Sequence, residues 1–109
     1  MYFSTQAEMI RIVLADYEWN IFPWIQHDLT TPFWRFYWNP TPGGVLELPG
    51  GQRVELSPEL FTVIPGYLRF STRAEQPFEQ FYIHFQLDDR LRLRPEHLFQ
   101  FPAGAELRD

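Results

Sequence analysis

The alternation of hydrophobic and polar positions predicts a chain of short β-strands. It is clearest in residues 78–87, which read FEQFYIHFQL, and in residues 33–38, which read FWRFYW. A strand points successive side chains to opposite faces, and aromatic residues favour strands over helices. Both segments are therefore predicted as strands with one apolar and one more polar face.

Proline and glycine divide the rest of the chain into pieces too short for a series of helices. The ten prolines and six glycines recur mostly every eight to ten residues, which is the spacing of strands and turns. Residues 49–52, PGGQ, are predicted as a hairpin turn because glycine supplies the positive φ that such turns need. Residues 20–31 are predicted as an irregular connection. Further strands are expected at 9–17, 45–48, 53–56, 60–64, 67–72, 90–94 and 98–101.

This set of about eight strands predicts an all-β fold with little or no helix. Strand edges must be hidden, and a small jelly-roll barrel does so economically. At 109 residues the chain is expected to hold one domain, residues 9–109, after a flexible N-terminal arm, residues 1–8. A helical turn at 95–97 is the most helix we expect.

Composition excludes several kinds of chemistry. The chain has no cysteine, which rules out disulfides, thiolate nucleophiles and iron–sulfur clusters. Its nine basic residues are all arginine, so Schiff-base and P-loop lysines are excluded too. The formal net charge of -5 argues against this chain holding a nucleic-acid backbone by itself. No signal peptide and no long apolar run is visible, so we expect a cytoplasmic protein without a membrane partner.

Two neighbouring predicted strands supply the candidate ligand-binding residues, which are Arg35, Tyr37, Gln80, Tyr82 and His84. If their side chains point into the barrel, they form a polar wall suited to a small hydroxyl-bearing ligand. If they point to solvent, the alternate aromatic positions fill the core instead. Alternation alone favours the second arrangement, with Arg35 exposed and with Trp34, Phe36 and Trp38 in the core. An inward arginine would need a carboxylate partner or an anionic ligand.

No catalytic set stands out. The many carboxylates show no spacing that marks a catalytic pair, and the serines lack a nucleophile-elbow context. The three histidines, His27, His84 and His97, are far apart in sequence. We therefore predict neither catalytic residues nor a metal or other cofactor.

The order of several segments resembles a known family. Residues 53–58 read RVELSP, residues 60–65 read LFTVIP and residues 81–85 read FYIHF. This order resembles the N-terminal sensor domain of AraC-type bacterial transcription regulators, a cupin or double-stranded β-helix, over roughly residues 33–89. Gly66 stands where the family often has a second proline, and Phe70 where it often has a histidine. No His-x-His pair occurs, so the resemblance implies a cupin without its metal.

The resemblance implies a sensor of a small-molecule effector, for example a sugar, bound inside the barrel, and not an enzyme. It implies a homodimer whose DNA contacts come from a helix-turn-helix part that lies outside this chain. It also implies that the arm, residues 1–8, closes over the mouth of the pocket. Two alternatives stay open from the residues: a stand-alone cupin enzyme, such as an isomerase or dioxygenase, and a metal-free binding or structural module.

Overall fold

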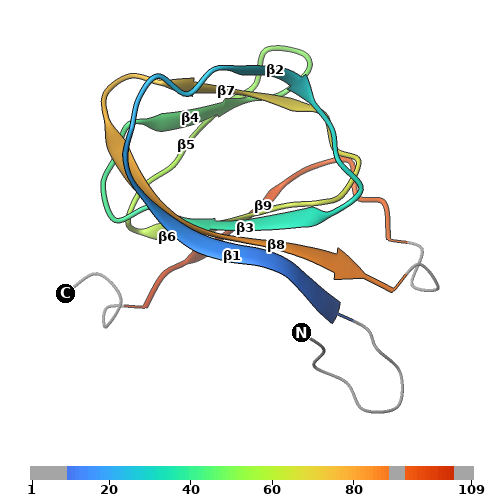
Figure 1. The fold of residues 1–109 in the computed structure, drawn as a ribbon. Helices are drawn as coiled ribbons and strands as arrows, with labels where there is room; N and C mark the ends of the chain where they lie inside the picture. The colour runs from blue at the N-terminus through green and yellow to red at the C-terminus, as the bar shows by residue number, and fades with distance from the viewer. Residues whose placement is uncertain (1–9, 89–92, 105–109) are drawn as a thin grey trace.

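The computed structural model describes residues 10–88 and 93–104, and this part of the chain contains nine strands and no helix (Figure 1). One sheet has five strands, in the order β1 (Ile10–Ile21), β8 (Phe78–Leu87), β3 (Trp34–Trp38), β6 (Leu60–Ile64) and β9 (Phe99–Pro102). The other has four, in the order β2 (Gln26–Leu29), β7 (Phe70–Ala74), β4 (Gly44–Glu47) and β5 (Arg53–Glu55).

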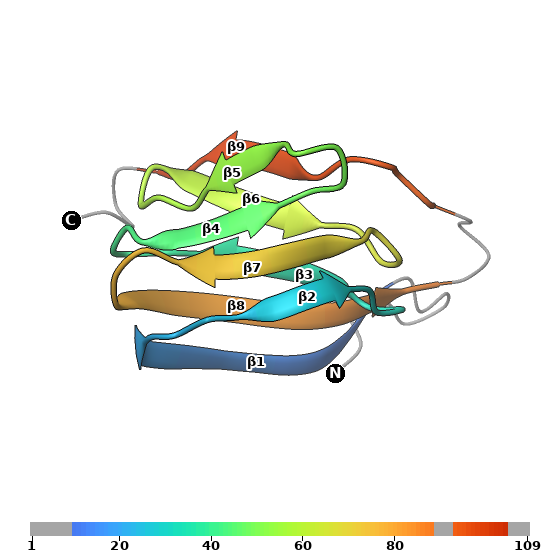
Figure 2. The same cartoon turned by 90° about the horizontal axis from the view of Figure 1, so that it is seen from above.

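The two sheets face each other and enclose the interior of a small jelly-roll-like barrel (Figure 1), and in the view from above the four-stranded sheet lies over the five-stranded one (Figure 2). Strand pairs within each sheet are antiparallel, and most join segments that are distant in sequence. Strand β3, for example, lies between β6 and β8. The predicted all-β fold of jelly-roll type is confirmed.

The predicted hairpin around the two adjacent glycines is also confirmed. Strands β4 and β5 pair in register across residues 48–52, and the Leu48 amide donates to the Gln52 carbonyl at 2.8 Å. Gly50 and Gly51 both have φ of 90°, in the region that side chains disfavour. The backbone of this turn therefore favours glycine at both positions.

The irregular connection predicted for residues 20–31 is wrong in two places. Strand β1 continues to Ile21 because the ten-residue strand β8 offers it partners along nearly its whole length. Residues 26–29 form β2, which pairs with β7 only through Gln26–Thr72 and Leu29–Phe70, with an irregularity between them. Such sparse pairing leaves little local pattern for a strand prediction to detect.

Other predicted boundaries shift or fall outside the described residues. The strand expected at 67–72 begins at Phe70, because Tyr67 has φ of 67° and its amide donates to the Thr31 carbonyl at 2.7 Å. Of the strand expected at 90–94, residues 90–92 lie outside the described part, and residues 93 and 94 are not in a strand. The predicted arm, residues 1–8, also lies outside the described residues.

The core lies between the sheets, and the face of β3 that points into it is the opposite of the one that alternation favoured. It is built from six buried side chains: Tyr37, Leu46, Val54, Leu56, Ile64 and Phe70. Trp34, Phe36 and Trp38 are only half-buried on the opposite face of the five-stranded sheet, so their expected place in the core is wrong. These rings shield one another across strands, as Phe36 does with Phe61 at 5.1 Å. The number of aromatic residues on a face of β3 therefore did not identify the face that points into the core.

We expect Gly43→Ala to destabilise the protein by about 2–3 kcal/mol, through backbone strain and a clash. Gly43 has φ of 132°, and a Cβ there would lie 2.8 Å from the Gln76 backbone oxygen. The matched control is Gly51→Ala, where φ is also positive but a Cβ would meet open space. The control should lose only about 1 kcal/mol in chemical denaturation. Equal losses for the two variants would contradict the close approach at Gly43.

Candidate functional site

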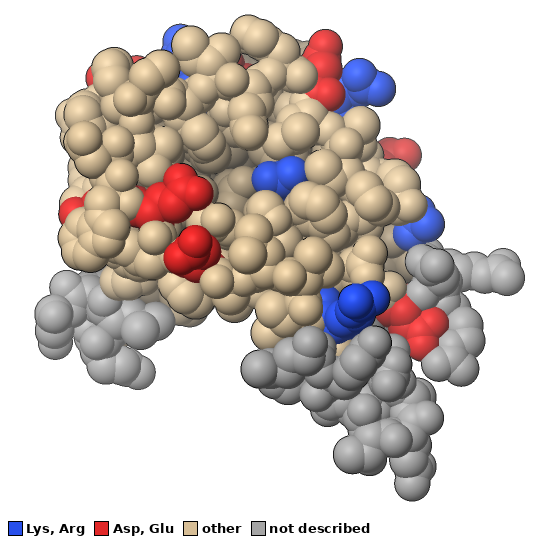
Figure 3. Space-filling model, in the orientation of Figure 1, with Lys and Arg blue, Asp and Glu red and all other residues tan. Residues whose placement is uncertain are grey.

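A pocket of about 130 Å³ opens between the two sheets. Figure 3 shows a hollow on this side of the molecule, with basic atoms inside it and acidic atoms at its edge. Its walls are Glu18, Trp24, Gln26, Arg35, Tyr37, Gln80, Tyr82 and His84. The structure thus brings together all five residues that the sequence singled out. That they bind a ligand remains a prediction.

Strand register explains why these side chains converge. Arg35 pairs with His84 and Tyr37 with Tyr82 across β3 and β8, and paired residues share a face of the sheet. The expectation that Arg35 is exposed is wrong, because only 7% of its surface is accessible. Period-two alternation had grouped these residues on one face, and the fold turns that face inward.

Arg35 lies at the base of the pocket without a carboxylate partner among the described residues. Its Nη1 donates to the Tyr37 hydroxyl at 3.3 Å, and its guanidinium carbon lies 4.9 Å from the Phe33 ring and 5.3 Å from the Phe70 ring. Its Nε is buried and has no hydrogen-bond partner in residues 10–88 and 93–104. A buried cation with an unsatisfied donor is destabilising.

The two tyrosines of the pocket present neutral hydroxyl groups. Burial raises the pKa of Tyr37, and the nearby Arg35 only partly opposes this. Burial also raises the pKa of Tyr82, and Glu18, whose carboxylate accepts from the Tyr82 hydroxyl at 3.3 Å, adds to the rise. Both phenols therefore keep their protons at neutral pH, and because the Tyr82 proton is donated to Glu18, the Tyr82 oxygen offers a ligand an acceptor.

Gln80 is buried and held in one orientation. The Asn39 Nδ2 donates to the Gln80 Oε1 at 3.0 Å and to the Glu79 carbonyl at 3.1 Å. Because the Gln80 oxygen is engaged by Asn39, the NH₂ of Gln80 is the end left for a ligand. The pocket wall thus offers a fixed amide donor beside the guanidinium.

His84 completes the polar wall as a neutral imidazole. Its ring stacks on Phe33 with 4.6 Å between centroids, and the Tyr82 ring lies 5.0 Å away. Burial and, to a lesser extent, the positive charge of Arg35 together lower the pKa of His84 to about 4. A neutral imidazole can donate through one nitrogen and accept through the other.

Three pocket residues were missed by the sequence analysis: Glu18, Trp24 and Gln26. Trp24 forms a wall, since its ring lies 5.0 Å from that of Phe78 and its carbonyl accepts from the Thr72 hydroxyl at 3.0 Å. Gln26 and Trp24 lie in the segment predicted as irregular. Glu18 reaches the site because β1 pairs with β8, and no local pattern in the sequence indicates that long-range pairing.

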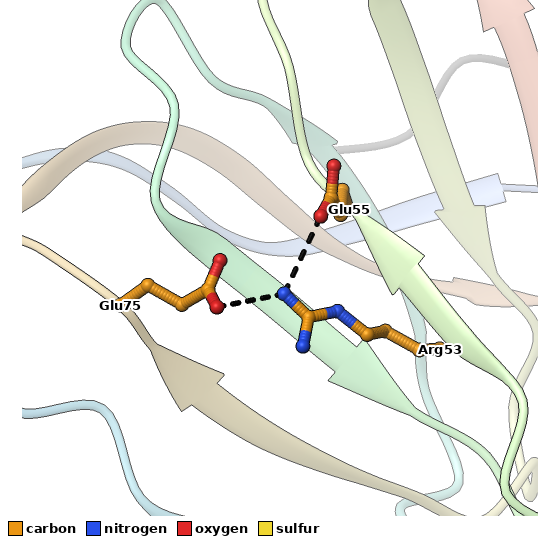
Figure 4. A network of polar contacts seen from close by, with 3 residues as sticks. All are labelled: Arg53, Glu55 and Glu75. Carbon is orange, nitrogen blue, oxygen red and sulfur yellow. Dashed lines mark hydrogen bonds and ion pairs between the residues drawn. The ribbon is translucent and has the colours of Figure 1, made fainter.

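A cluster of ion pairs lies on the surface, outside this pocket. Arg53 Nη2 contacts a carboxylate oxygen of Glu75 at 2.7 Å and one of Glu55 at 3.3 Å (Figure 4). All three side chains are substantially exposed. A larger hollow of about 250 Å³ borders this cluster, but its walls contain no buried charged side chain. Exposed ion pairs of this kind contribute little to stability, so Arg53 serves as a matched control for Arg35.

The described residues contain no group of three or more histidine, cysteine, aspartate or glutamate side chains placed to hold a metal ion. A helix long and apolar enough to cross a membrane is likewise not found in that part of the chain.

The low pKa of His84 predicts a loss of stability in acid. Its folded pKa of about 4 lies below the ordinary value of 6.5, so below pH 6.5 the unfolded chain takes up a proton that the folded chain resists. Stability should therefore fall as the pH drops from 6.5 towards 4. Allowing for solvent screening of this half-buried ring, we expect a loss of about 1 kcal/mol.

Urea denaturation at pH 7 and at pH 4.5 measures this effect. His84→Gln should remove about 1 kcal/mol of the difference between the two pH values. His27→Gln, at an exposed position on β2, should leave the difference in place. A His84→Gln profile identical to that of the unmodified protein would contradict the assigned environment of His84.

Comparison with known proteins finds solved structures with a similar fold and no matching family. Neither a protein-family model nor a curated protein sequence matches this chain. Among solved structures, an apo variant of ToxT from Vibrio cholerae strain SCE256 matches with a TM-score of 0.58 and 8% identity, over 85% of this chain and 42% of that one. A second structure of ToxT from Vibrio cholerae matches with a TM-score of 0.57 and 10% identity, over 90% of this chain and 44% of that one.

A third match is wild-type ToxT from the same strain with an unsaturated fatty acid bound. Its TM-score is 0.55 at 6% identity, and the match covers 95% of this chain and 44% of that one. This chain therefore spans less than half the length of the ToxT structures. At these identities the likeness establishes a shared fold.

Proposed function

We propose that this chain is the effector-sensing domain of an AraC-type transcription regulator and binds a small molecule between its two sheets. The observation that carries the proposal is the polar pocket around Arg35, a buried cation whose hydrogen bonds the described protein does not complete. The domain is a binding module in this proposal and not an enzyme.

Two independent lines support this assignment. The segments that resemble the AraC-type sensor domain run over residues 33–89, which span β3 to β8. Three structures that share the fold are of ToxT, an AraC-family regulator, and one of them holds a fatty acid. Sequence motifs and fold therefore agree on one type of protein.

The pocket suggests how binding is transmitted. Its walls come from both sheets, with Gln26 from the four-stranded sheet and Glu18, Arg35 and Gln80 from the five-stranded sheet. A ligand that touches both sheets favours the arrangement in which they are held together. A homodimer and a separate helix-turn-helix part would then convert this preference into DNA binding in the cytoplasm.

A thermal-shift screen of sugars, polyols and small organic acids tests the proposal. A ligand present at 100 times its Kd should stabilise the domain by about 2.7 kcal/mol, a rise in Tm of roughly 10 °C. Tyr82→Phe, which removes one pocket hydroxyl, should reduce the rise. The matched control Tyr67→Phe changes an exposed tyrosine outside this pocket and should preserve it.

Two results would contradict the proposal. One is a screen in which no small molecule raises the Tm. The other is a stabilising ligand whose effect is the same in the Tyr82→Phe and Tyr67→Phe proteins, because such a ligand would bind elsewhere.

A further inference from the structure

We propose that the effector is a small monocarboxylate, preferably a hydroxy acid, whose carboxylate pairs with the Arg35 guanidinium between the sheets. This inference rests on the proposed function and adds the chemical class of the ligand. It starts from a charge that the described residues leave unbalanced.

The first step is the charge itself. Arg35 is 93% buried, and no described carboxylate lies within ion-pair distance of it. Buried charges in proteins are almost always paired, because desolvation of a lone ion is expensive. The Phe33 and Phe70 rings face the guanidinium but supply no negative charge. An anionic ligand supplies the missing partner.

The second step is the geometry of the guanidinium. Its Nη1 donates to the Tyr37 hydroxyl, whereas its buried Nε finds no partner in the part of the chain that the structure describes. Nε and Nη2 form one edge of the planar group, with two parallel N–H bonds that match the two oxygens of a carboxylate. The Nε itself is covered in the structure, so a carboxylate from the pocket would satisfy it only after a small shift of the Arg35 side chain.

The third step separates a monoanion from a more highly charged ligand. One buried cation faces the pocket, and the exposed Glu18 lies in its wall. Glu18 offsets the formal charge of Arg35 within the pocket wall, so a carboxylate brings one excess negative charge and a phosphate dianion brings two. The larger excess of negative charge beside Glu18 is more unfavourable in a partly dry site. The charge count therefore favours a carboxylate.

The fourth step concerns size and the remaining contacts. A volume of about 130 Å³ suits a molecule of a few heavy atoms and is too small to enclose a long acyl chain. The Gln80 amide, the Tyr82 hydroxyl and the neutral His84 offer donors and acceptors beside Arg35. Such groups match a hydroxyl carried near the carboxylate. A short hydroxy acid fits both the volume and the chemistry.

Calorimetric titration with matched acids and amides tests this inference. The probes are acetate and lactate, each compared with acetamide or lactamide at constant ionic strength. We expect the acids to bind at least tenfold more tightly than their amides, as for loss of a charge-assisted hydrogen bond. Lactate should bind more tightly than acetate.

Variants of charged residues assign the effect to Arg35. Arg35→Gln should weaken lactate binding at least about tenfold, and Arg35→Lys, which keeps the charge but loses the planar fork, should weaken it less. Arg53→Gln, the same change at an exposed arginine, should bind lactate as the unmodified protein does. Glu18→Gln should tighten lactate binding about two- to threefold, because it removes a like charge from the pocket wall.

The outcomes separate this inference from the proposed function. If lactamide or glycerol binds as tightly as lactate and Arg35→Gln has no effect, the proposed carboxylate ligand is contradicted. The proposed function as a small-molecule sensor is then still supported. If neither acids nor neutral compounds saturate the protein, both are contradicted. A thermal unfolding transition shows whether each variant is folded. If Arg35→Gln is not folded, the affinity of Arg35→Lys for lactate is used to test the role of Arg35.

Discussion

Phe78→Ala is expected to lower the free energy of unfolding by about 3–5 kcal/mol, the usual cost of removing a fully buried aromatic ring. Phe78 is only 1% exposed at the start of β8. Its ring lies 5.0 Å from that of Trp24, and a Cβ added to Gly44 would approach it to within 3.0 Å. The surrounding atoms are therefore close on several sides, and a cavity there is expensive.

The matched control for Phe78→Ala is Phe101→Ala. Phe101 lies in β9 and is 50% exposed, so its loss should cost less than about 1 kcal/mol. Urea denaturation of the two variants compares an inward with an outward phenylalanine. A loss for Phe101→Ala as large as that for Phe78→Ala would show that the outer aromatic face is covered, and the assignment of faces would be wrong.

Arg35→Met is expected to have an effect of opposite sign on the free energy of unfolding. It should raise the stability of the ligand-free protein by about 1–3 kcal/mol, because a buried unpaired charge is replaced by an apolar side chain of similar length. The methionine sulfur can keep a favourable contact with the Phe33 and Phe70 rings. The measurement is the urea midpoint in a buffer without carboxylates.

Arg53→Met provides the comparison for Arg35→Met. Arg53 forms exposed ion pairs with Glu55 and Glu75, so its replacement should leave stability unchanged or slightly lower. If Arg35→Met instead destabilises the ligand-free protein, Arg35 has a structural partner, and its role as a ligand anchor is contradicted.

Local pattern predicted much of this molecule. The alternation in residues 78–87 gave the exact bounds of β8, and the glycines at 50 and 51 gave the hairpin. The same alternation grouped Gln80, Tyr82 and His84 on one face, and the structure places them in one pocket. Period-two spacing is a property of the backbone, so it can be read from sequence without knowing the fold.

Other features depend on contacts between distant segments. Which face of β3 points inward is decided by the position of the four-stranded sheet, so the aromatic face with Trp34 and Phe36 was wrongly favoured as core. Strand β2 exists through its pairing with β7, and Glu18 enters the site through the pairing of β1 with β8. The residues within a strand do not indicate which distant strand it will pair with. The entropy lost in closing the long loops between such strands is offset only by the contacts of the complete fold.

The most direct test of the central claim is isotope-edited NMR of the Arg35 side chain, with the signal assigned by comparison with Arg35→Lys. The account predicts an Nε–H that is shielded from solvent exchange and that shifts in a saturable way as sodium lactate is added, with no such shift from lactamide. An Arg35 Nε–H that exchanges rapidly with water, and whose chemical shift does not change with lactate, would contradict the claim that a buried guanidinium binds a carboxylate.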